Sequence, residues 1–142
     1  MEDIFPAVNL IRQFEGCRLS AYYDIVGRLT IGWGTTHDVT PEMQISQQEA
    51  DQMLRLDCET LELKIKNLVK VEISNNALCA LISFCYNLGL GSFLHSTLLT
   101  KLNADAPKEE CAAEILKWDH AAGAVVPGLT RRRQAEAALF LS

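Results

Sequence analysis

The chain has few of the residues from which metal sites and disulfide frameworks are built. Its three histidines, at positions 37, 95 and 120, are scattered without metal-ligand spacing, which disfavours a zinc amidase. Its five cysteines are odd in number and include no Cys-x-x-Cys pair. We therefore expect free thiols in a reducing compartment, most of them acting as small core hydrophobes. The sequence implies no metal and no organic cofactor.

The sequence also lacks a segment that would direct it to or through a membrane. The start, Met1-Glu2-Asp3, has no cationic region, and a proline and an asparagine interrupt the apolar run from Ile4 to Ile11. Residues 73–100 carry no formal charge, but Gly89-Leu90-Gly91 breaks this stretch. Because a spanning helix needs about 20 predominantly apolar residues, two buried helices joined by a turn are the better interpretation. We expect no stable membrane insertion.

The first half of the chain predicts a helix, a hairpin and a longer helix. Apolar residues at helical spacing run from Ile4 to Glu15, and the glycine that follows ends this helix. Residues 18–34 predict a short β-hairpin with its turn near residues 26–28. Ser46 and Glu49 form a capping box that begins a helix reaching about residue 69. Its single thin apolar stripe is typical of a helix that bridges two lobes, or of an ordinary surface helix.

The second half is helical and more apolar. Helices are expected from Ser74 or Asn75 to near Gly89, over roughly 96–103, from about Pro107, and over 130–141, with Pro127-Gly128 as a break before the last. The 142 residues, 49% of them hydrophobic, suit one small domain. The fold class is therefore α+β and predominantly helical. The expected architecture is a small lobe with a hairpin, a connecting helix and a larger helical lobe.

Two carboxylates and a threonine mark a candidate catalytic site. Glu15 closes the first helix, where the negative end of the helix dipole favours a protonated carboxyl. Asp24 stands at the mouth of the hairpin, and Thr30 lies on its return strand. Glycoside hydrolysis needs one carboxyl group as an acid for the leaving oxygen and another as base or nucleophile. Without further context, a solvated glutamate is the favoured interpretation of Glu15, and a turn-capping aspartate and a strand threonine explain the other two.

The spacing Glu-x8-Asp-x5-Thr, followed by Thr-Ile-Gly-x-Gly, closely resembles the phage-type lysozymes, glycoside hydrolase family 24. The stretches Phe84–Asn103 and Trp118–Glu136 resemble two later segments of that family in order and separation. The resemblance implies a single lysozyme-like domain over residues 1–142. Its parts are a small hairpin lobe at about 16–45, a connecting helix at about 46–69, and a helical lobe at about 70–142 that includes the N-terminal helix.

The resemblance also implies an activity, the hydrolysis of the β-1,4 bond between N-acetylmuramic acid and N-acetylglucosamine in peptidoglycan. Glu15 is then the general acid, and Asp24 and Thr30 position the attacking water of an inverting mechanism. Tyr86, Asn87 and Ser96 match positions that contact sugar, although helix packing and capping explain Asn87 and Ser96 as well. Alternatives are a lytic transglycosylase acting on the same bond and a non-catalytic peptidoglycan-binding module.

The net charge of −5 gives the chain no overall attraction to the anionic cell wall. Electrostatic attraction is therefore expected from the cluster Arg131-Arg132-Arg133, of which one arginine pairs with Glu15 or Asp24 and the others meet wall carboxylates. A solvated helix face is the alternative. We expect a monomer with no nucleic-acid partner. Without an export signal it accumulates in the host cytoplasm and needs a separate holin-like protein to reach the wall.

Overall fold

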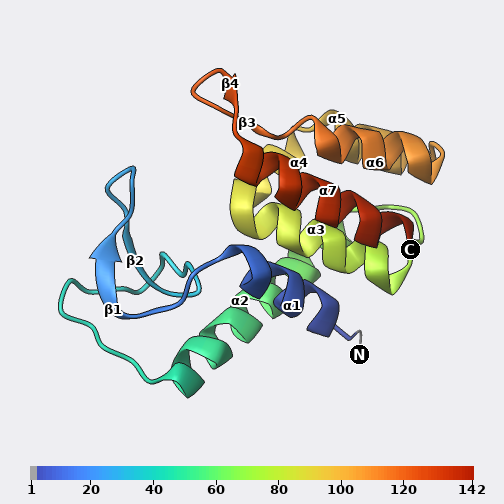
Figure 1. The fold of residues 1–142 in the computed structure, drawn as a ribbon. Coiled ribbons are helices and arrows are strands. Elements are labelled where there is room, and N and C mark those ends of the chain that lie inside the picture. The colour runs from blue at the N-terminus through green and yellow to red at the C-terminus, as the bar shows by residue number, and fades with distance from the viewer. Residues whose placement is uncertain (1–2) are drawn as a thin grey trace.

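The protein is described by a computed structural model that covers residues 3–142 (Figure 1). Of the N-terminal segment considered above, Met1 and Glu2 lie outside the described residues. The elements in chain order are α1 (Phe5–Phe14), β1 (Arg18–Tyr23), β2 (Leu29–Gly32), α2 (Gln47–Leu68), α3 (Asn75–Leu88), α4 (Leu90–Leu94), α5 (Thr97–Asn103), α6 (Lys108–Leu116), β3 (His120–Ala121), β4 (Ala124–Val125) and α7 (Pro127–Leu141). The predicted fold class, mostly helical with a small antiparallel sheet, is confirmed.

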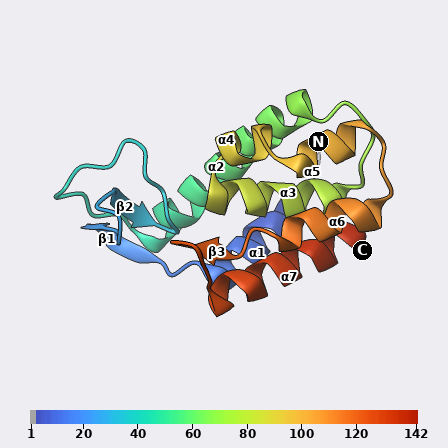
Figure 2. The ribbon, with the colours of Figure 1, turned by 90° about the horizontal axis from the view of Figure 1, so that it is seen from above.

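The first two strands form the predicted hairpin. They pair antiparallel, with Tyr22 opposite Thr30 and Tyr23 opposite Leu29, and an irregularity in register follows Arg18. At the turn, the backbone N–H of Asp24 donates to the carbonyl oxygen of Arg28 at 2.8 Å. The hairpin lies apart from the helices α3 to α7 in both views of the ribbon (Figures 1 and 2).

Helix α2 connects the hairpin to the helical part of the molecule. The expected capping box is present: the N–H of Glu49 donates to the Ser46 hydroxyl and the N–H of Ser46 to the Glu49 carboxylate, each at 3.1 Å. Leu54, Cys58 and Ile65 of its apolar stripe are fully buried. The helix packs against β2 and also against α1 and α3, so it bridges the two parts rather than lying on one surface (Figure 2).

Helix α3 is the centre of the core. Its residues from Ala77 to Cys85 are all buried, as expected of a charge-free stretch, and it packs against α1, α2, α4 and α7. A helix that is apolar on all faces belongs in such a surrounded position. All five cysteines are free thiols, as predicted, and four of them are buried. Within residues 3–142, no helix has both the length and the apolar character needed to cross a membrane.

Three features of the second half differ from the expectation or were absent from it. The prediction that Pro127-Gly128 breaks the chain is wrong, because α7 begins at Pro127 itself. Proline suits a first helical position, where its missing N–H has no intrahelical partner. The short helix α4 and the β3–β4 hairpin were not predicted. The hairpin pairs His120 with Val125 and Ala121 with Ala124, and strands of two residues carry almost no periodic signal.

Candidate active site

Five of the six predicted site residues line one cavity between the hairpin and the helices, which we call the central cavity. Glu15 caps the C-terminal end of α1, Asp24 follows β1, and Thr30 lies in β2. Tyr86 and Asn87 come from the last turn of α3. The cavity measures about 240 Å³ and is lined by Glu15, Tyr22, Asp24, Arg28, Thr30, Gly34, Thr36, Tyr86 and Asn87.

Ser96 is not brought together with the other five. Its hydroxyl donates to the carbonyl oxygen of Phe93 at 2.6 Å and accepts from the N–H of Leu99 at 3.0 Å, so it caps helix α5. The residue is 4% exposed. Its polar atoms are thus engaged inside the helical part, and the capping interpretation of Ser96 is the one that the structure supports.

The Asp24 carboxylate is fixed by the turn of the hairpin. Its Oδ1 accepts from the backbone N–H groups of Val26 at 3.0 Å and Arg28 at 2.8 Å, and its Oδ2 accepts from Arg28 Nε at 3.0 Å. The backbone hydrogen bond from Arg28 is the main reason why the pKa of Asp24 is lowered. The turn-capping interpretation of Asp24 is therefore correct, and it is compatible with a place in the cavity.

Thr30 is buried, and Arg28 contacts it as well. The Thr30 hydroxyl donates to the Arg28 carbonyl oxygen at 3.0 Å. Arg28 therefore touches Asp24 through its side chain and Thr30 through its backbone. Arg28 was not among the predicted site residues; its position four residues after Asp24, across a tight turn, is the sequence signal for it.

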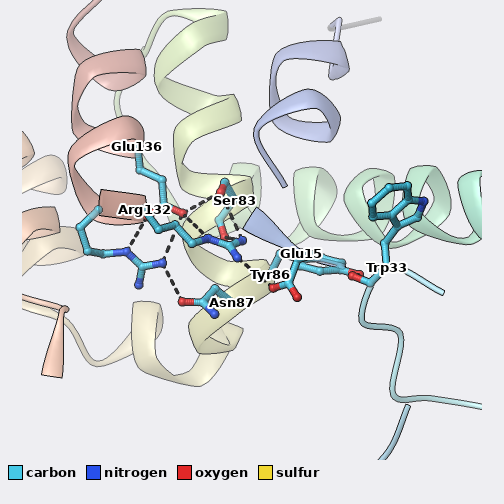
Figure 3. Close-up of polar contacts among 8 residues, drawn as sticks. Glu15, Trp33, Ser83, Tyr86, Asn87, Arg132 and Glu136 are labelled. Atoms are coloured by element: carbon cyan, nitrogen blue, oxygen red, sulfur yellow. Dashed lines mark hydrogen bonds and ion pairs between the residues drawn. The ribbon is translucent and has the colours of Figure 1, made fainter. Parts of the chain in front are cut away.

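Glu15 is held from the helical side by an arginine of α7. Arg132 Nη1 donates to Glu15 Oε1 at 2.8 Å (Figure 3). The other oxygen, Oε2, faces Gly34: a Cβ atom at this glycine would lie 3.5 Å from Oε2 and 3.4 Å from the Tyr86 hydroxyl. Gly34 also has φ +109°, which other residues rarely adopt. Glycine at this position therefore lets the backbone pass between the two side chains.

A fully buried carboxylate, Glu136, organises this side of the site (Figure 3). Its oxygens lie 3.3 Å from Arg132 Nε and 2.7 Å from Arg133 Nε, and it accepts from the Ser83 hydroxyl at 2.6 Å. Arg133 Nη2 donates in turn to Asn87 Oδ1 at 2.7 Å. The same carboxylate thus holds two arginines, and each arginine holds one residue of the central cavity.

The prediction that the two arginines without a catalytic partner meet the wall is wrong for Arg133. Arg132 and Arg133 are 3% and 0% exposed and engaged in the network just described, whereas Arg131 is exposed. The prediction that one of the three pairs with Glu15 is confirmed, by Arg132. Glu136, four residues after Arg132 and three after Arg133, is the sequence signal for inward orientation.

Tyr86, which lines the central cavity, connects helix α3 to the segment that follows β2. Its hydroxyl donates to the carbonyl oxygen of Trp33 at 2.7 Å. The Trp33 indole N–H donates to Asp51 of α2 at 2.8 Å, so Trp33 is held from two helices. Burial raises the pKa of Tyr86, and the phenol stays neutral as the hydrogen-bond donor.

The central cavity continues on both sides into larger hollows. One, the α7 cavity, shares Glu15 and Asn87 with it and measures about 480 Å³. The other, the α2 cavity, shares Gly34, Thr36 and Tyr86 with it and measures about 540 Å³. Because the central cavity shares lining residues with each of the other two, we call the three together the groove; Glu15 and Asp24 line its central part, and its extended shape suits a polymer. Residues 3–142 contain no group of three or more His, Cys, Asp or Glu side chains placed to hold a metal ion.

Comparison with known proteins identifies the family of this chain. The sequence matches the phage lysozyme family over residues 12–136. The protein belongs to the phage lysozyme family. An endolysin of Acyrthosiphon pisum secondary endosymbiont phage 1 is 39% identical over 137 residues, which cover 94% of this chain and 93% of that protein. An endolysin of Bacillus phage B103 is 41% identical over 138 residues, or 95% of this chain, but this match spans only 52% of that protein.

Solved structures give the same result for the fold. The muramidase domain of SpmX from Asticaccaulis excentricus superimposes with a TM-score of 0.90 at 33% identity, covering 100% of this chain and 99% of that one. A variant of P22 lysozyme superimposes with a TM-score of 0.84 at 32% identity, again covering 100% and 99%. The predicted family, which matches over residues 12–136, and the lysozyme-like fold are thus confirmed.

A histidine–aspartate pair beside the groove predicts a pH-dependent stability. His37 Nε2 lies 2.6 Å from Asp57 Oδ1 of α2, and the Asp57 hydrogen bond is the main reason why the pKa of His37 is raised above its usual 6.5. A raised pKa in the folded state stabilises the fold fully below pH 6.5, and this contribution is lost as the pH rises through the folded-state value.

We therefore expect His37→Gln to lower the free energy of unfolding by up to about 1 kcal/mol at low pH, with a difference that shrinks at alkaline pH. Urea unfolding of both proteins between about pH 5 and pH 9 measures this. His95→Gln, at another exposed histidine, is the control and leaves the pH dependence unchanged. A difference that is constant across the range, or that grows with pH, contradicts the interpretation of the pair.

Proposed function

We propose that the protein is a peptidoglycan hydrolase that cleaves the β-1,4 bond between N-acetylmuramic acid and N-acetylglucosamine. One observation supports the proposal most strongly: Glu15, at the end of α1, and Asp24, at the turn of the hairpin, line the central cavity together with Thr30. Membership of the phage lysozyme family supports the same activity. An open groove with two carboxyl groups at its middle suits internal cleavage of a glycan strand.

Glu15 is the proposed general acid. Its Oε1 accepts from Arg132, so the proton that protonates the glycosidic oxygen belongs on Oε2, which faces Gly34 and the cavity. Arg132 fixes the direction in which this oxygen points. Orientation of this kind matters because proton transfer requires the acid within hydrogen-bond reach of the leaving oxygen.

Asp24 and Thr30 are the proposed ligands of the attacking water. Asp24 Oδ1 already accepts two backbone hydrogen bonds, whereas Oδ2 accepts one, from Arg28 Nε, and keeps a further acceptor position for a water. The Thr30 hydroxyl donates its hydrogen to the Arg28 carbonyl oxygen, so toward a water the Thr30 oxygen acts as an acceptor. A water that donates one hydrogen to each ligand keeps its lone pairs free for the anomeric carbon. This geometry supports direct attack by water, and hence inversion.

Two further residues are proposed to contact the sugar. Asn87 Oδ1 accepts from Arg133, which leaves the amide NH₂ of Asn87 as a donor toward the cavity. Tyr86 presents part of its ring there, since its hydroxyl is already engaged with Trp33. Ser96 is omitted from this set because its hydroxyl caps α5.

The biological setting proposed is lysis of a bacterial host, with peptidoglycan glycan strands as the substrate. The endolysins named above, from phages of different hosts, support it. That the protein acts as a monomer, and that a holin-like protein gives it access to the wall, stay predictions from the sequence.

Removal of the acid tests the proposal directly. Glu15→Gln keeps the side-chain shape and an oxygen for Arg132 but has no proton of suitable acidity, so we expect kcat to fall by about 10²–10⁴-fold. The melting temperature should change little. The matched control is Glu42→Gln, at an exposed glutamate of the same half of the chain, which leaves kcat unchanged. Lysis of permeabilised cells by Glu15→Gln at a near wild-type rate means that another residue is the acid.

The products decide between the activities considered from the sequence. Hydrolysis of purified peptidoglycan leaves reducing muramic ends by mass spectrometry, whereas a transglycosylase leaves anhydro ends and a binding module releases no fragments. With a soluble oligosaccharide, NMR of fresh product should show the α-anomer first, because attack by water on a β bond inverts the centre. A β-anomer formed first contradicts the role given to Asp24 and Thr30, since it requires retention through a covalent intermediate.

A further inference from the structure

We infer that Arg28 is a positioning residue of this site, which holds the Oδ2 oxygen of Asp24 and the hydroxyl of Thr30 toward one water. The inference rests on the proposed function of Asp24 and Thr30. Arg28 hydrogen-bonds to both, through its guanidinium at 3.0 Å from Asp24 Oδ2 and its carbonyl oxygen at 3.0 Å from Thr30 Oγ1.

The two contacts act on different degrees of freedom. Asp24 Oδ1 is anchored by two backbone N–H groups of the turn, so the carboxylate can still turn about the direction of those bonds. Arg28 Nε restrains the second oxygen and removes this freedom. The Arg28 carbonyl fixes the hydroxyl hydrogen of Thr30, so that its oxygen stays an acceptor. A side-chain substitution removes the first restraint and leaves the second in place.

The charges around the cavity give Arg28 a second effect. The titratable side chains that line it are Glu15, Tyr22, Asp24 and Tyr86, and Arg28 is the single cation among the lining residues. Glu15 has its own cation, Arg132, on the helical side. Without the Arg28 guanidinium, the Asp24 carboxylate is stabilised only by backbone N–H donors, while Glu15 lines the same cavity. The ionised form of Asp24 is then less favoured.

The position of the pair at the mouth of the groove makes it sensitive to salt. The side chain of Arg28 is 67% exposed and that of Asp24 18%. Attraction between such charges is screened as ionic strength rises. Screening of the net charge of −5 has the opposite effect, since it lowers the pKa of Asp24, so a pKa that rises with salt identifies the attraction to Arg28.

The test is an NMR titration of the Asp24 side-chain carboxyl carbon in the Glu15→Gln background, which prevents turnover. At low salt, adding Arg28→Gln should move the Asp24 midpoint to higher pH. In the active protein the same substitution should move the acid limb of kcat to higher pH and lower its plateau about three- to tenfold, with little change in KM. Arg55→Gln is the matched control, since Arg55 is also an exposed arginine whose Nε pairs with a carboxylate four residues away.

A midpoint that moves with Arg28→Gln and not with Arg55→Gln supports the inference, and an unmoved Asp24 midpoint overturns it. If Arg28→Gln does not fold, salt added to the Glu15→Gln protein gives the decision. The Asp24 midpoint rises with salt if attraction to Arg28 outweighs the net charge of −5, and a midpoint that stays constant or falls overturns the inference. Failure of the proposed function can be told apart from these outcomes, because Asp24→Asn would then hydrolyse peptidoglycan at a near wild-type rate.

Discussion

The buried ion cluster around Glu136 is the interaction on which the rest of the structure depends. Transfer of a carboxylate from water into a protein interior costs several kcal/mol, so a fully buried glutamate requires partners. Glu136 has two guanidinium groups, from Arg132 and Arg133, and the Ser83 hydroxyl of α3. Because α7 and α3 are packed side by side, this cluster fixes how α7 lies on the central helix (Figures 1 and 3).

The same cluster joins the stability of the core to the geometry of the groove. Arg132 extends from Glu136 to Glu15 at the end of α1, and Arg133 extends from Glu136 to Asn87 at the end of α3. Helix α7 therefore orients the proposed acid and a proposed sugar contact, although its own residues line the α7 cavity and not the central cavity. On the hairpin side, the tight turn plays the corresponding role, with Arg28 and backbone N–H groups around Asp24. The site thus has two independent supports, one buried and one exposed.

Local signals predicted most of the fold, whereas the site residues were assigned by the resemblance to the phage-type lysozymes. The capping box at Ser46, the charge-free stretch that became α3, and the glutamate closing the first helix were each readable from a few neighbouring residues. What failed depended on distant contacts or on weak local signals. An Arg-Arg-Arg run looks like a solvated face unless its partners are known, and Glu15 lies 117 residues from Arg132. Likewise, Pro127 fits the start of a helix as well as a break, and only the packing of α7 decides between them.

The account is tested most directly by removing the charge of Glu136 and measuring stability and activity together. Glu136→Gln leaves the buried Arg133 without its paired carboxylate and leaves Arg132 with Glu15 alone. We therefore expect the free energy of unfolding to fall by about 3–5 kcal/mol and kcat of the folded protein to fall at least about tenfold. Glu114→Gln is the matched control: Glu114 is also a buried carboxylate shared by two cations, but its partners, Lys101 and Lys117, are more exposed and do not line the central cavity. It should cost about 1 kcal/mol and leave kcat unchanged. Folded Glu136→Gln protein with wild-type kcat contradicts the claim that this carboxylate orients the site.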